Sequence, residues 1–191
     1  MPFPPRIFWK EFTKINVLGT IPYLIDGETK MTESCGIPVY LVKKFGNKQL
    51  EVQPDEPDYG AYLNWLSHAD ATLTFPQTVK LRYTKLEPQK KLDKAGDDYG
   101  KWYIARLRLL DSVLADGREF LCANRFTIAD IAITYALFLG TTLELDGQYQ
   151  SQTRKYMERM LARPAVEALK KEEEESGELF QKRLEEQQSK L

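Results

Sequence analysis

The sequence lacks a hydrophobic run long enough to cross a bilayer, which needs about 20 consecutive apolar residues. Residues 1–6 also lack the charged segment followed by an apolar segment that marks a signal peptide. The chain also has no marked excess of one charge, since 27 basic and 28 acidic residues give a net charge of −1. The basic residues are scattered along the sequence. These absences predict a cytoplasmic protein whose partners include neither a membrane nor nucleic acid.

Metal-binding side chains are scarce, since the chain has two cysteines, Cys35 and Cys122, and one histidine, His68. The cysteines are far apart and show neither CxxC nor Cys/His spacing, so a zinc site cannot be assembled convincingly. We therefore expect free thiols and no metal. A nucleophile paired with histidine would have to use His68, which we expect to lie on the flank of a helix instead.

What the chain does contain begins with a strand–turn–strand–helix pattern in residues 22–46. An Asp-Gly pair separates two strand-like segments, and both residue types tolerate the positive φ angles of a tight hairpin turn. Glu33 and Ser34 then open an apolar run that predicts a helix ending at Gly46. Pro38 falls within the first two turns of that helix, where it predicts a late start or a bend.

A polar linker, residues 47–57, precedes a part with helical periodicity throughout. The expected helices are 58–84 with a kink or break at Pro76, 98–115, one that follows Thr127, and 151–168 with an interruption at Pro164. Residues 170–191 are rich in Glu, Gln and Lys, which favours a solvated helical tail over a segment that binds a specific partner.

One helix start is marked sharply by Thr127 and Asp130. Their spacing is typical of a capping box, in which the Thr127 hydroxyl accepts a hydrogen bond from the backbone amide of Asp130 and the Asp130 carboxylate accepts one from the backbone amide of Thr127. Residues 131–139 are nearly all apolar, and a helix that is apolar on every side is expected to be buried centrally. We interpret both capping residues as stabilising the fold and not as binding a ligand.

Three motifs follow one another along the chain: Gly19-Thr-Ile-Pro-Tyr-Leu-Ile-Asp-Gly, then Thr32-Glu33-Ser34 before a helix, then Phe126-Thr127-Ile-Ala-Asp130-Ile. Their order and spacing resemble the soluble glutathione transferase superfamily, particularly its bacterial members. The resemblance implies the glutathione transferase fold. In that fold an α/β thioredoxin-like N-terminal domain that binds glutathione, here residues 1–50, packs on an all-α C-terminal helical bundle, here residues 51–191.

The resemblance assigns glutathione contacts to four residues. Pro22 corresponds to a proline that follows a cis peptide bond in the family, and the main chain of Ile21 would pair with the cysteinyl part of glutathione. Glu33 would face the ammonium of the γ-glutamyl group, and Ser34, at a helix N-terminus, would bind its carboxylate. From the residues alone, a plain turn at Ile21 and Pro22 and a simple helix cap at Ser34 stay open.

Other contacts are less specified. Candidates for binding the glycine carboxylate of glutathione are Trp9, Lys10 and Lys14. A pocket for an apolar second substrate would be lined by the start of the helical part, where four aromatic residues are eligible and none is assigned: Tyr59, Tyr62, Trp65 and Phe75.

The chain departs from the family at its N-terminus. Residues 1–11 are too few for the first strand, helix and second strand, a unit of roughly 30 residues or more. We therefore expect an incomplete N-terminal domain and a sequence that starts late. The family's thiol-activating Tyr, Ser or Cys belongs to that unit, so no catalytic residue is assigned. The spare candidate, Cys35, is expected to be a buried or spectator thiol.

The implied function is that of a glutathione transferase, or an N-terminally truncated form of one, with glutathione as co-substrate. Such an enzyme joins the glutathione thiolate to small hydrophobic electrophiles. The alternatives are a non-catalytic transferase-like binding or structural module and a specialised glutathione-dependent etherase, dehalogenase or peroxidase. A fold alone does not rank these chemistries. The resemblance also implies a homodimer.

Overall fold

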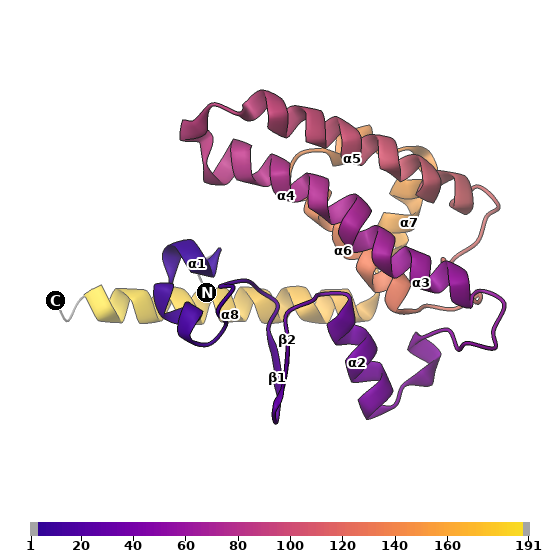
Figure 1. The fold of residues 1–191 in the computed structure, drawn as a ribbon, viewed down its shortest axis with the longest axis horizontal. Coiled ribbons are helices and arrows are strands. Elements are labelled where there is room, and N and C mark those ends of the chain that lie inside the picture. The colour runs from indigo at the N-terminus through magenta and orange to yellow at the C-terminus, as the bar shows by residue number, and fades with distance from the viewer. Residues whose placement is uncertain (1–3, 189–191) are drawn as a thin grey trace.

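The computed structural model describes residues 4–188, with side chains described for residues 4–6 and 9–176. We call residues 4–46 the N-terminal part and residues 58–188 the helical part; the linker joins them (Figure 1). The N-terminal part holds a small hairpin between short helices, whereas the helical part contains no strand among its described residues. No described helix is both long and apolar enough to cross a membrane.

The N-terminal part begins with two short helical segments that contact the loop before the hairpin. They are α1 (Pro5–Phe8) and the 3-10 helix η1 (Lys10–Lys14). The backbone amide of Arg6 donates to the carbonyl of Gly19 at 3.2 Å. Gly19 has a φ of 59°, and a Cβ there would lie 2.7 Å from the Cβ of Arg6, so this close contact requires glycine.

The predicted hairpin is confirmed. Strands β1 (Leu24–Asp26) and β2 (Thr29–Met31) pair antiparallel, and the glycine of the Asp-Gly turn has a φ of 59°. Asp26 also ties the hairpin to the following helix, because its carboxylate accepts a hydrogen bond from the Tyr40 hydroxyl at 2.9 Å and pairs with the Lys44 ammonium.

The helix after the hairpin, α2 (Gly36–Phe45), begins two residues later than Glu33 and Ser34 predicted. These two residues form a turn instead, and the first two amides of α2 donate to the Glu33 carbonyl at 3.1 and 3.0 Å. Pro38 lies in the first turn of α2, where its missing N–H has no intrahelical partner, so the helix accommodates it. Gly46 ends the helix with a φ of 89°, as predicted.

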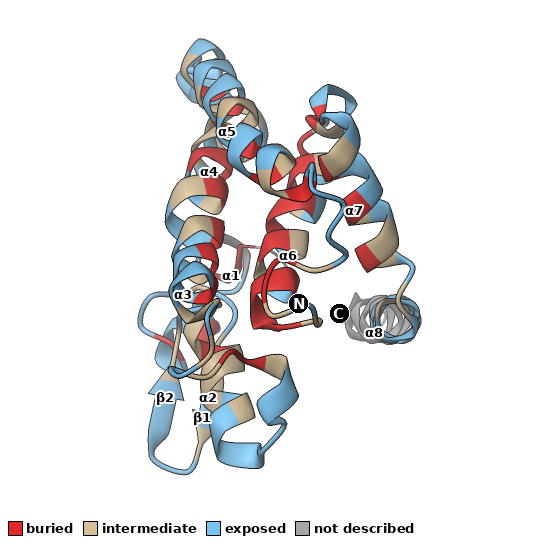
Figure 2. Ribbon diagram, turned by 90° about the vertical axis from the view of Figure 1, so that its right-hand side faces the viewer, coloured by how far each residue is buried: buried red, intermediate tan, exposed pale blue. Residues whose placement is uncertain are grey.

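The helical part is built from long helices that pack on one another. Its described α-helices are α3 (Tyr59–Ser67), α4 (Phe75–Leu81), α5 (Asp93–Leu114), α6 (Ile128–Thr142), α7 (Ser151–Leu161) and α8 (Pro164–Gln188). Shorter 3-10 segments are η2 (Lys48–Leu50) in the linker, η5 (Pro88–Lys90) and η6 (Asp146–Gln148). Helix α4 packs along α5, and α6 packs against α3 on one side and α7 on the other (Figures 1 and 2).

The predicted irregularity at Pro76 takes the form of a π-helical turn. The segment η3 (His68–Thr74) widens the helix directly before α4, whose second residue is Pro76, and η4 (Arg82–Leu86) repeats the widening after it. The Thr74 hydroxyl donates to the carbonyl of Ala69 at 2.8 Å within η3. A proline without an amide is therefore placed where the regular hydrogen-bond ladder is already interrupted.

Helix α5 begins at Asp93, five residues before the predicted start at residue 98. Sequence reasoning missed this first turn because it is polar and contains a glycine. Gly96 allows a close approach to the preceding helical segment, since a Cβ there would lie 3.1 Å from Cγ2 of Thr84.

The hydrophobic core lies where α6 meets its neighbours (Figure 2). Ile133 and Leu137 of α6 are fully buried, as are Leu73 of η3, Leu110 of α5 and Tyr156 of α7. The first residue of this core along the chain is Val52, in the linker. The core therefore belongs to the helical part and the linker, and the N-terminal part adds only partly buried side chains to its edge.

The predicted capping box at the start of α6 is confirmed and is larger than the sequence indicated. The buried Asp130 carboxylate accepts hydrogen bonds from the Thr127 amide at 2.8 Å and the Thr127 hydroxyl at 3.1 Å. It also accepts from the Leu121 amide at 3.0 Å and the Tyr156 hydroxyl at 2.8 Å. Burial raises the pKa of Asp130, and these four donors act in the opposite direction.

The prediction that residues 131–139 are buried on every side is wrong. Ile131, Tyr135 and Phe138 share one face of α6 and are 40%, 57% and 45% exposed. The neighbouring helices cover the other faces of α6 and leave this one open among the described residues.

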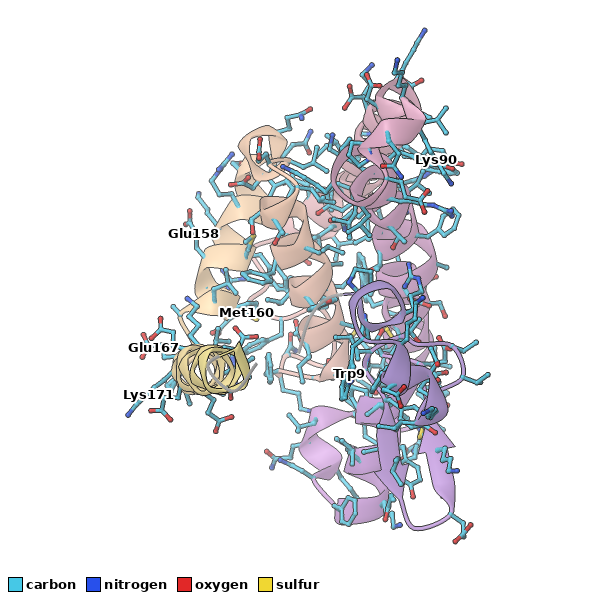
Figure 3. All side chains as sticks on the ribbon, turned by 90° about the vertical axis from the view of Figure 1, so that its left-hand side faces the viewer. Trp9, Lys90, Glu158, Met160, Glu167 and Lys171 are labelled. Carbon is cyan, nitrogen blue, oxygen red and sulfur yellow. The ribbon has the colours of Figure 1, made fainter. Side chains whose placement is uncertain are left out.

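The chain breaks between α7 and α8 at Pro164, as predicted. Helix α8 leaves the bundle as a single long helix (Figure 1). Its described residues 167–176 are exposed, and Glu167 and Lys171 point away from the rest of the molecule (Figure 3). Residues 170–176 are thus helical and exposed, the absence of a specific partner stays a prediction, and residues 189–191 lie outside the described range.

Candidate functional site

The hairpin brings the four predicted ligand-binding residues to one end of the N-terminal part. Leu24 and Met31 form the pair farthest from the turn, so the chain enters and leaves the hairpin at the same end. Ile21 and Pro22 precede that pair, and Glu33 and Ser34 follow it. The backbone register therefore places the two predicted motifs opposite one another, although they are separated along the chain.

The loop before the hairpin is held by Asn16, which sequence reasoning missed. Its buried amide nitrogen donates to the carbonyl of Thr20 at 2.7 Å, and its side-chain oxygen accepts from the Leu18 amide at 3.1 Å. The peptide bond between Ile21 and Pro22 is cis. Neither the N–H nor the C=O of Ile21 has a hydrogen-bond partner among the described residues, so both are available to a ligand.

Glu33 and Ser34 are exposed on the turn that leads into α2. The Glu33 carboxylate accepts a hydrogen bond from the neighbouring Thr32 hydroxyl at 3.0 Å. Within the described residues, the amides of Ser34 and Cys35 donate to no acceptor. The turn thus offers a carboxylate, a hydroxyl and free amides next to the positive end of the α2 dipole.

Among the described residues, no hydrogen bond or ion pair joins the candidates for the glycine carboxylate to the four predicted ligand-binding residues. Trp9 stacks on Phe12 with ring centroids 5.6 Å apart, and Lys14 pairs with Glu11 on the same short segment. Lys10 is exposed and forms no ion pair with a described residue. The segments that hold them contact the loop at Gly19 through Arg6 and Thr13.

Cys35 is half-buried at the N-terminal end of α2. Burial raises the pKa of the Cys35 thiol, and the nearby Asp70 carboxylate of η3 adds to this increase. The neutral thiol is therefore favoured, against the decrease that a helix N-terminus alone would produce. This environment agrees with the expectation of a spectator thiol.

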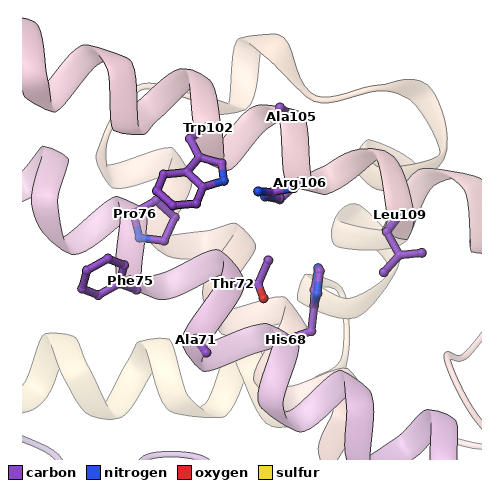
Figure 4. Close-up of a pocket in the computed structure, with 9 residues that line it drawn as sticks. All are labelled: His68, Ala71, Thr72, Phe75, Pro76, Trp102, Ala105, Arg106 and Leu109. Carbon is purple, nitrogen blue, oxygen red and sulfur yellow. The ribbon is translucent and has the colours of Figure 1, made fainter.

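A cavity of about 390 Å³ lies in the helical part, between the α3–η3–α4 segment and α5 (Figure 4). It is lined by His68, Ala71, Thr72, Phe75, Pro76, Trp102, Ala105, Arg106 and Leu109. Helix α2 lies on the other side of the α3–η3–α4 segment (Figures 1 and 2). This cavity is therefore separate from the end of the hairpin where the predicted glutathione residues lie.

Of the four aromatic residues eligible for a second-substrate pocket, Phe75 alone lines this cavity, whereas Tyr62 and Trp65 are buried in the core. His68 faces the cavity (Figure 4), while the sequence placed it only on a helix flank. Burial, together with the positive charge of Arg106, lowers the pKa of His68, so the neutral imidazole is favoured.

Comparison with solved structures identifies the fold. A structure of Ure2p5 from Phanerochaete chrysosporium, cocrystallized with 1-(S-glutathionyl)-2,4-dinitrobenzene, matches with a TM-score of 0.74 at 24% identity over 88% of this chain and 82% of that chain. A sphingomonad glutathione S-transferase complexed with glutathione matches with a TM-score of 0.70 at 23% identity over 82% and 75%. The fold is thus that of the glutathione transferases, with a partial thioredoxin-like N-terminal domain and a helical C-terminal domain.

Sequence comparison agrees with the structural comparison. Residues 103–164 match the family model of the glutathione S-transferase C-terminal domain. Glutathione S-transferase D7 of Drosophila melanogaster is 31% identical over 128 residues, which is 64% of this chain. The matches to this protein and two other insect relatives span 53 to 62% of the relatives' own length. The helical domain, the relatives and the fold all support the glutathione transferase superfamily for this chain.

Proposed function

We propose that the chain binds glutathione at the open end of the hairpin, through Ile21, Pro22, Glu33 and Ser34. The observation that carries this proposal is the free main chain of Ile21, held opposite a helix start that offers an exposed carboxylate, a hydroxyl and unpaired amides. Glutathione is a peptide with complementary groups: a central amide pair, a carboxylate and an ammonium. The match therefore covers the γ-glutamyl and cysteinyl parts of the ligand.

Each residue has a physical role in this proposal. The N–H and C=O of Ile21 pair with the cysteinyl peptide unit as one strand pairs with another, which orients the thiol without demanding a particular side chain. Ser34 and the free amides before α2 hold the γ-glutamyl carboxylate, where the helix dipole favours negative charge. Glu33 holds the neighbouring ammonium by charge attraction.

We further propose that bound glutathione is the co-substrate of a transferase that joins its thiolate to small hydrophobic electrophiles. The support is the similarity to the superfamily and to two solved structures of the same fold, one complexed with glutathione and one cocrystallized with a glutathionyl dinitrobenzene. Similarity to the superfamily is also the basis for proposing a cytoplasmic homodimer. Light scattering tests the homodimer, because a monomer at micromolar concentration contradicts it.

A second candidate is a glutathione-binding module without conjugating activity. It is favoured because none of the four residues assigned to the site is a thiol-activating group, and the neighbouring Cys35 thiol is half-buried, which raises its pKa. In this candidate the N-terminal part recognises glutathione and the helical part supplies stability or a surface for other proteins.

Calorimetric titration with reduced glutathione tests binding. We expect saturable binding that Ser34→Ala weakens and that the control Ser67→Ala, an exposed serine at the end of α3, leaves unchanged. Ligand at 100 times its Kd should stabilise the fold by about 2.7 kcal/mol. Equal affinities for both variants would remove Ser34 from the site.

Conjugation of glutathione to 1-chloro-2,4-dinitrobenzene separates the two candidates. A rate above that of glutathione alone, lowered by Ser34→Ala, supports the transferase. Binding without any increase in rate supports the module.

A further inference from the structure

Arg125, in the loop before α6, makes the most extensive polar contact between the helical part and the linker. Its Nη1 and Nη2 atoms each lie 2.7 Å from one oxygen of the Glu56 carboxylate. Nη2 also donates to the carbonyl of Glu51 at 2.7 Å, and Nε donates to the carbonyl of Gln49 at 3.1 Å. One guanidinium thus holds three residues of the linker, which a single ammonium could not do.

The contacts continue from the linker into the N-terminal part. Glu51 is only 4% exposed, and its carboxylate lies 3.1 Å from the ammonium of Lys43 on α2 and accepts a hydrogen bond from Gln53 at 3.0 Å. The backbone amide of Gln53 in turn donates to the Glu56 carboxylate at 2.6 Å. We call Arg125, Glu56, Gln53, Glu51 and Lys43 the linker network. It connects a helical-part loop to the C-terminal half of α2.

Helix α2 has few other ties to the bundle. Its side of the contact consists of partly buried residues at the edge of the core, including Val39 and Val42. The hairpin moves with α2, because Tyr40 and Lys44 bind Asp26. The orientation of the hairpin and α2 is therefore set by a small apolar contact and by the linker network.

We propose that Arg125 is a positioning residue for the ligand site, acting through Glu56 and Glu51 to keep α2 and the hairpin packed on the helical part, so that the unit in which Ile21 and Ser34 are aligned stays folded. The inference rests on the proposed glutathione site. Arg125 itself touches none of the four residues assigned to that site. Its side chain is needed because the N-terminal part has little core of its own to fix this orientation.

The test compares Arg125→Gln with Arg118→Gln in the whole chain. Arg118 is a matched control: it lies in the same loop, pairs with Asp116 and donates to the carbonyl of Leu121, and has no partner in the linker among the described residues. Amide hydrogen exchange of α2 and the hairpin should accelerate in Arg125→Gln, while α5, α6 and α7 keep their protection. In Arg118→Gln, α2 and the hairpin should exchange as in the unmodified chain.

Glutathione affinity provides the readout that a purely structural role would leave unchanged. If loss of the network leaves the aligned arrangement populated about one-fifth of the time, the apparent Kd rises about fivefold. The measurement is made well below the melting temperature, where every variant is folded. Arg125→Lys, which keeps the charge pair but not the three-way contact, should give an intermediate value. Glu56→Gln added to Arg125→Gln should change the Kd little further.

Three results would overturn the proposal: unchanged exchange in α2 and the hairpin, equal acceleration across all helices, or an equal effect of Arg118→Gln. An unchanged Kd in Arg125→Gln would overturn it as well. If the unmodified chain binds no glutathione, the proposed function fails on that result alone. The exchange experiment still decides the role of Arg125 in orienting α2, since it uses no ligand.

Discussion

The helical part and the N-terminal part are stabilised in different ways. Every residue of the main buried core comes from the helical part or the linker. The described N-terminal part buries two large apolar side chains, Phe12 and Ile37, and exposes eight: Trp9, Ile15, Val17, Leu18, Ile21, Ile25, Leu41 and Phe45. Since buried apolar area is the main stabilising contribution in proteins, the helical part is the stable element and the N-terminal part depends on it.

The difference has a consequence for function. The proposed glutathione residues lie in the part with the least core, on two three-residue strands and one helix start. An isolated two-stranded hairpin is only marginally stable in water. The site therefore relies on contacts with the helical part, and ligand binding should stabilise the N-terminal part more than the bundle.

The largest loss in the free energy of unfolding is expected from Asp130→Ala, in the helical part. The substitution leaves the Leu121 and Thr127 amides and the Tyr156 hydroxyl without their acceptor, each at a cost of about 1–3 kcal/mol. Urea denaturation should show a loss of at least about 3 kcal/mol. Asp116→Ala, an exposed carboxylate, is the control with a much smaller expected change. A loss below about 1 kcal/mol for Asp130→Ala would show that the box is not central to stability.

The next largest effect is expected from Gly140→Ala in α6. A Cβ at this position would lie 1.9 Å from the hydroxyl oxygen of Tyr149 and 2.8 Å from that of Tyr103, which are hydrogen-bonded to each other at 2.6 Å. Forcing the two rings apart should cost about 1–3 kcal/mol. Removing the hydroxyl first, in Tyr149→Phe, should reduce the added cost of Gly140→Ala. Additive losses would contradict the steric explanation.

A smaller, pH-dependent effect is expected where the two parts meet. Arg125 and the Gln53 amide lower the pKa of Glu56 from 4.5 to about 2. A carboxyl whose pKa is lowered in the folded state stabilises the fold fully above its unfolded pKa, and this contribution is lost as the pH falls from about 4.5 towards about 2. The stability difference between the unmodified chain and Glu56→Gln should therefore be constant near neutrality and shrink below pH 4.5. A difference that does not vary with pH would contradict this account.

The smallest effect is expected from Phe45→Ser at the end of α2. Phe45 is 68% exposed, so its replacement should change the free energy of unfolding by no more than about 0.5 kcal/mol. The contrasting change, Leu110→Ala in the core, should cost about 2–5 kcal/mol. Urea denaturation measures both changes in the free energy of unfolding. A loss for Phe45→Ser as large as that for Leu110→Ala would contradict the view that the N-terminal part contributes little to stability.

The features that the sequence predicted correctly are local ones. An Asp-Gly turn, a glycine at a helix end and a Thr-x-x-Asp box each involve residues within four positions of one another, so composition and spacing suffice. The same locality brings Ile21 and Ser34 to one end of the hairpin in the structure. The short pattern between them fixes the strand pairing.

The features that the sequence missed depend on contacts between distant segments. Arg125 meets Glu56 and Gln49 across about seventy residues of chain, and no local pattern distinguishes it from the chain's other arginines. The exposed face of α6 could not be anticipated either. Periodicity shows which residues are apolar, but only the packed neighbours decide which of them are covered. Helix α5 begins before its predicted start because the packing of Gly96 against α4 outweighs the low helix propensity of glycine.

The central claim is that glutathione binds the N-terminal part at the end of the hairpin, and a titration of the isotope-labelled chain followed by amide NMR tests it most directly. Reduced glutathione should shift the amides of residues 20–23 and 33–36 first and most, with smaller changes along α2. Shifts concentrated at the cavity lined by Phe75 and Trp102, or none at millimolar glutathione, would contradict the claim.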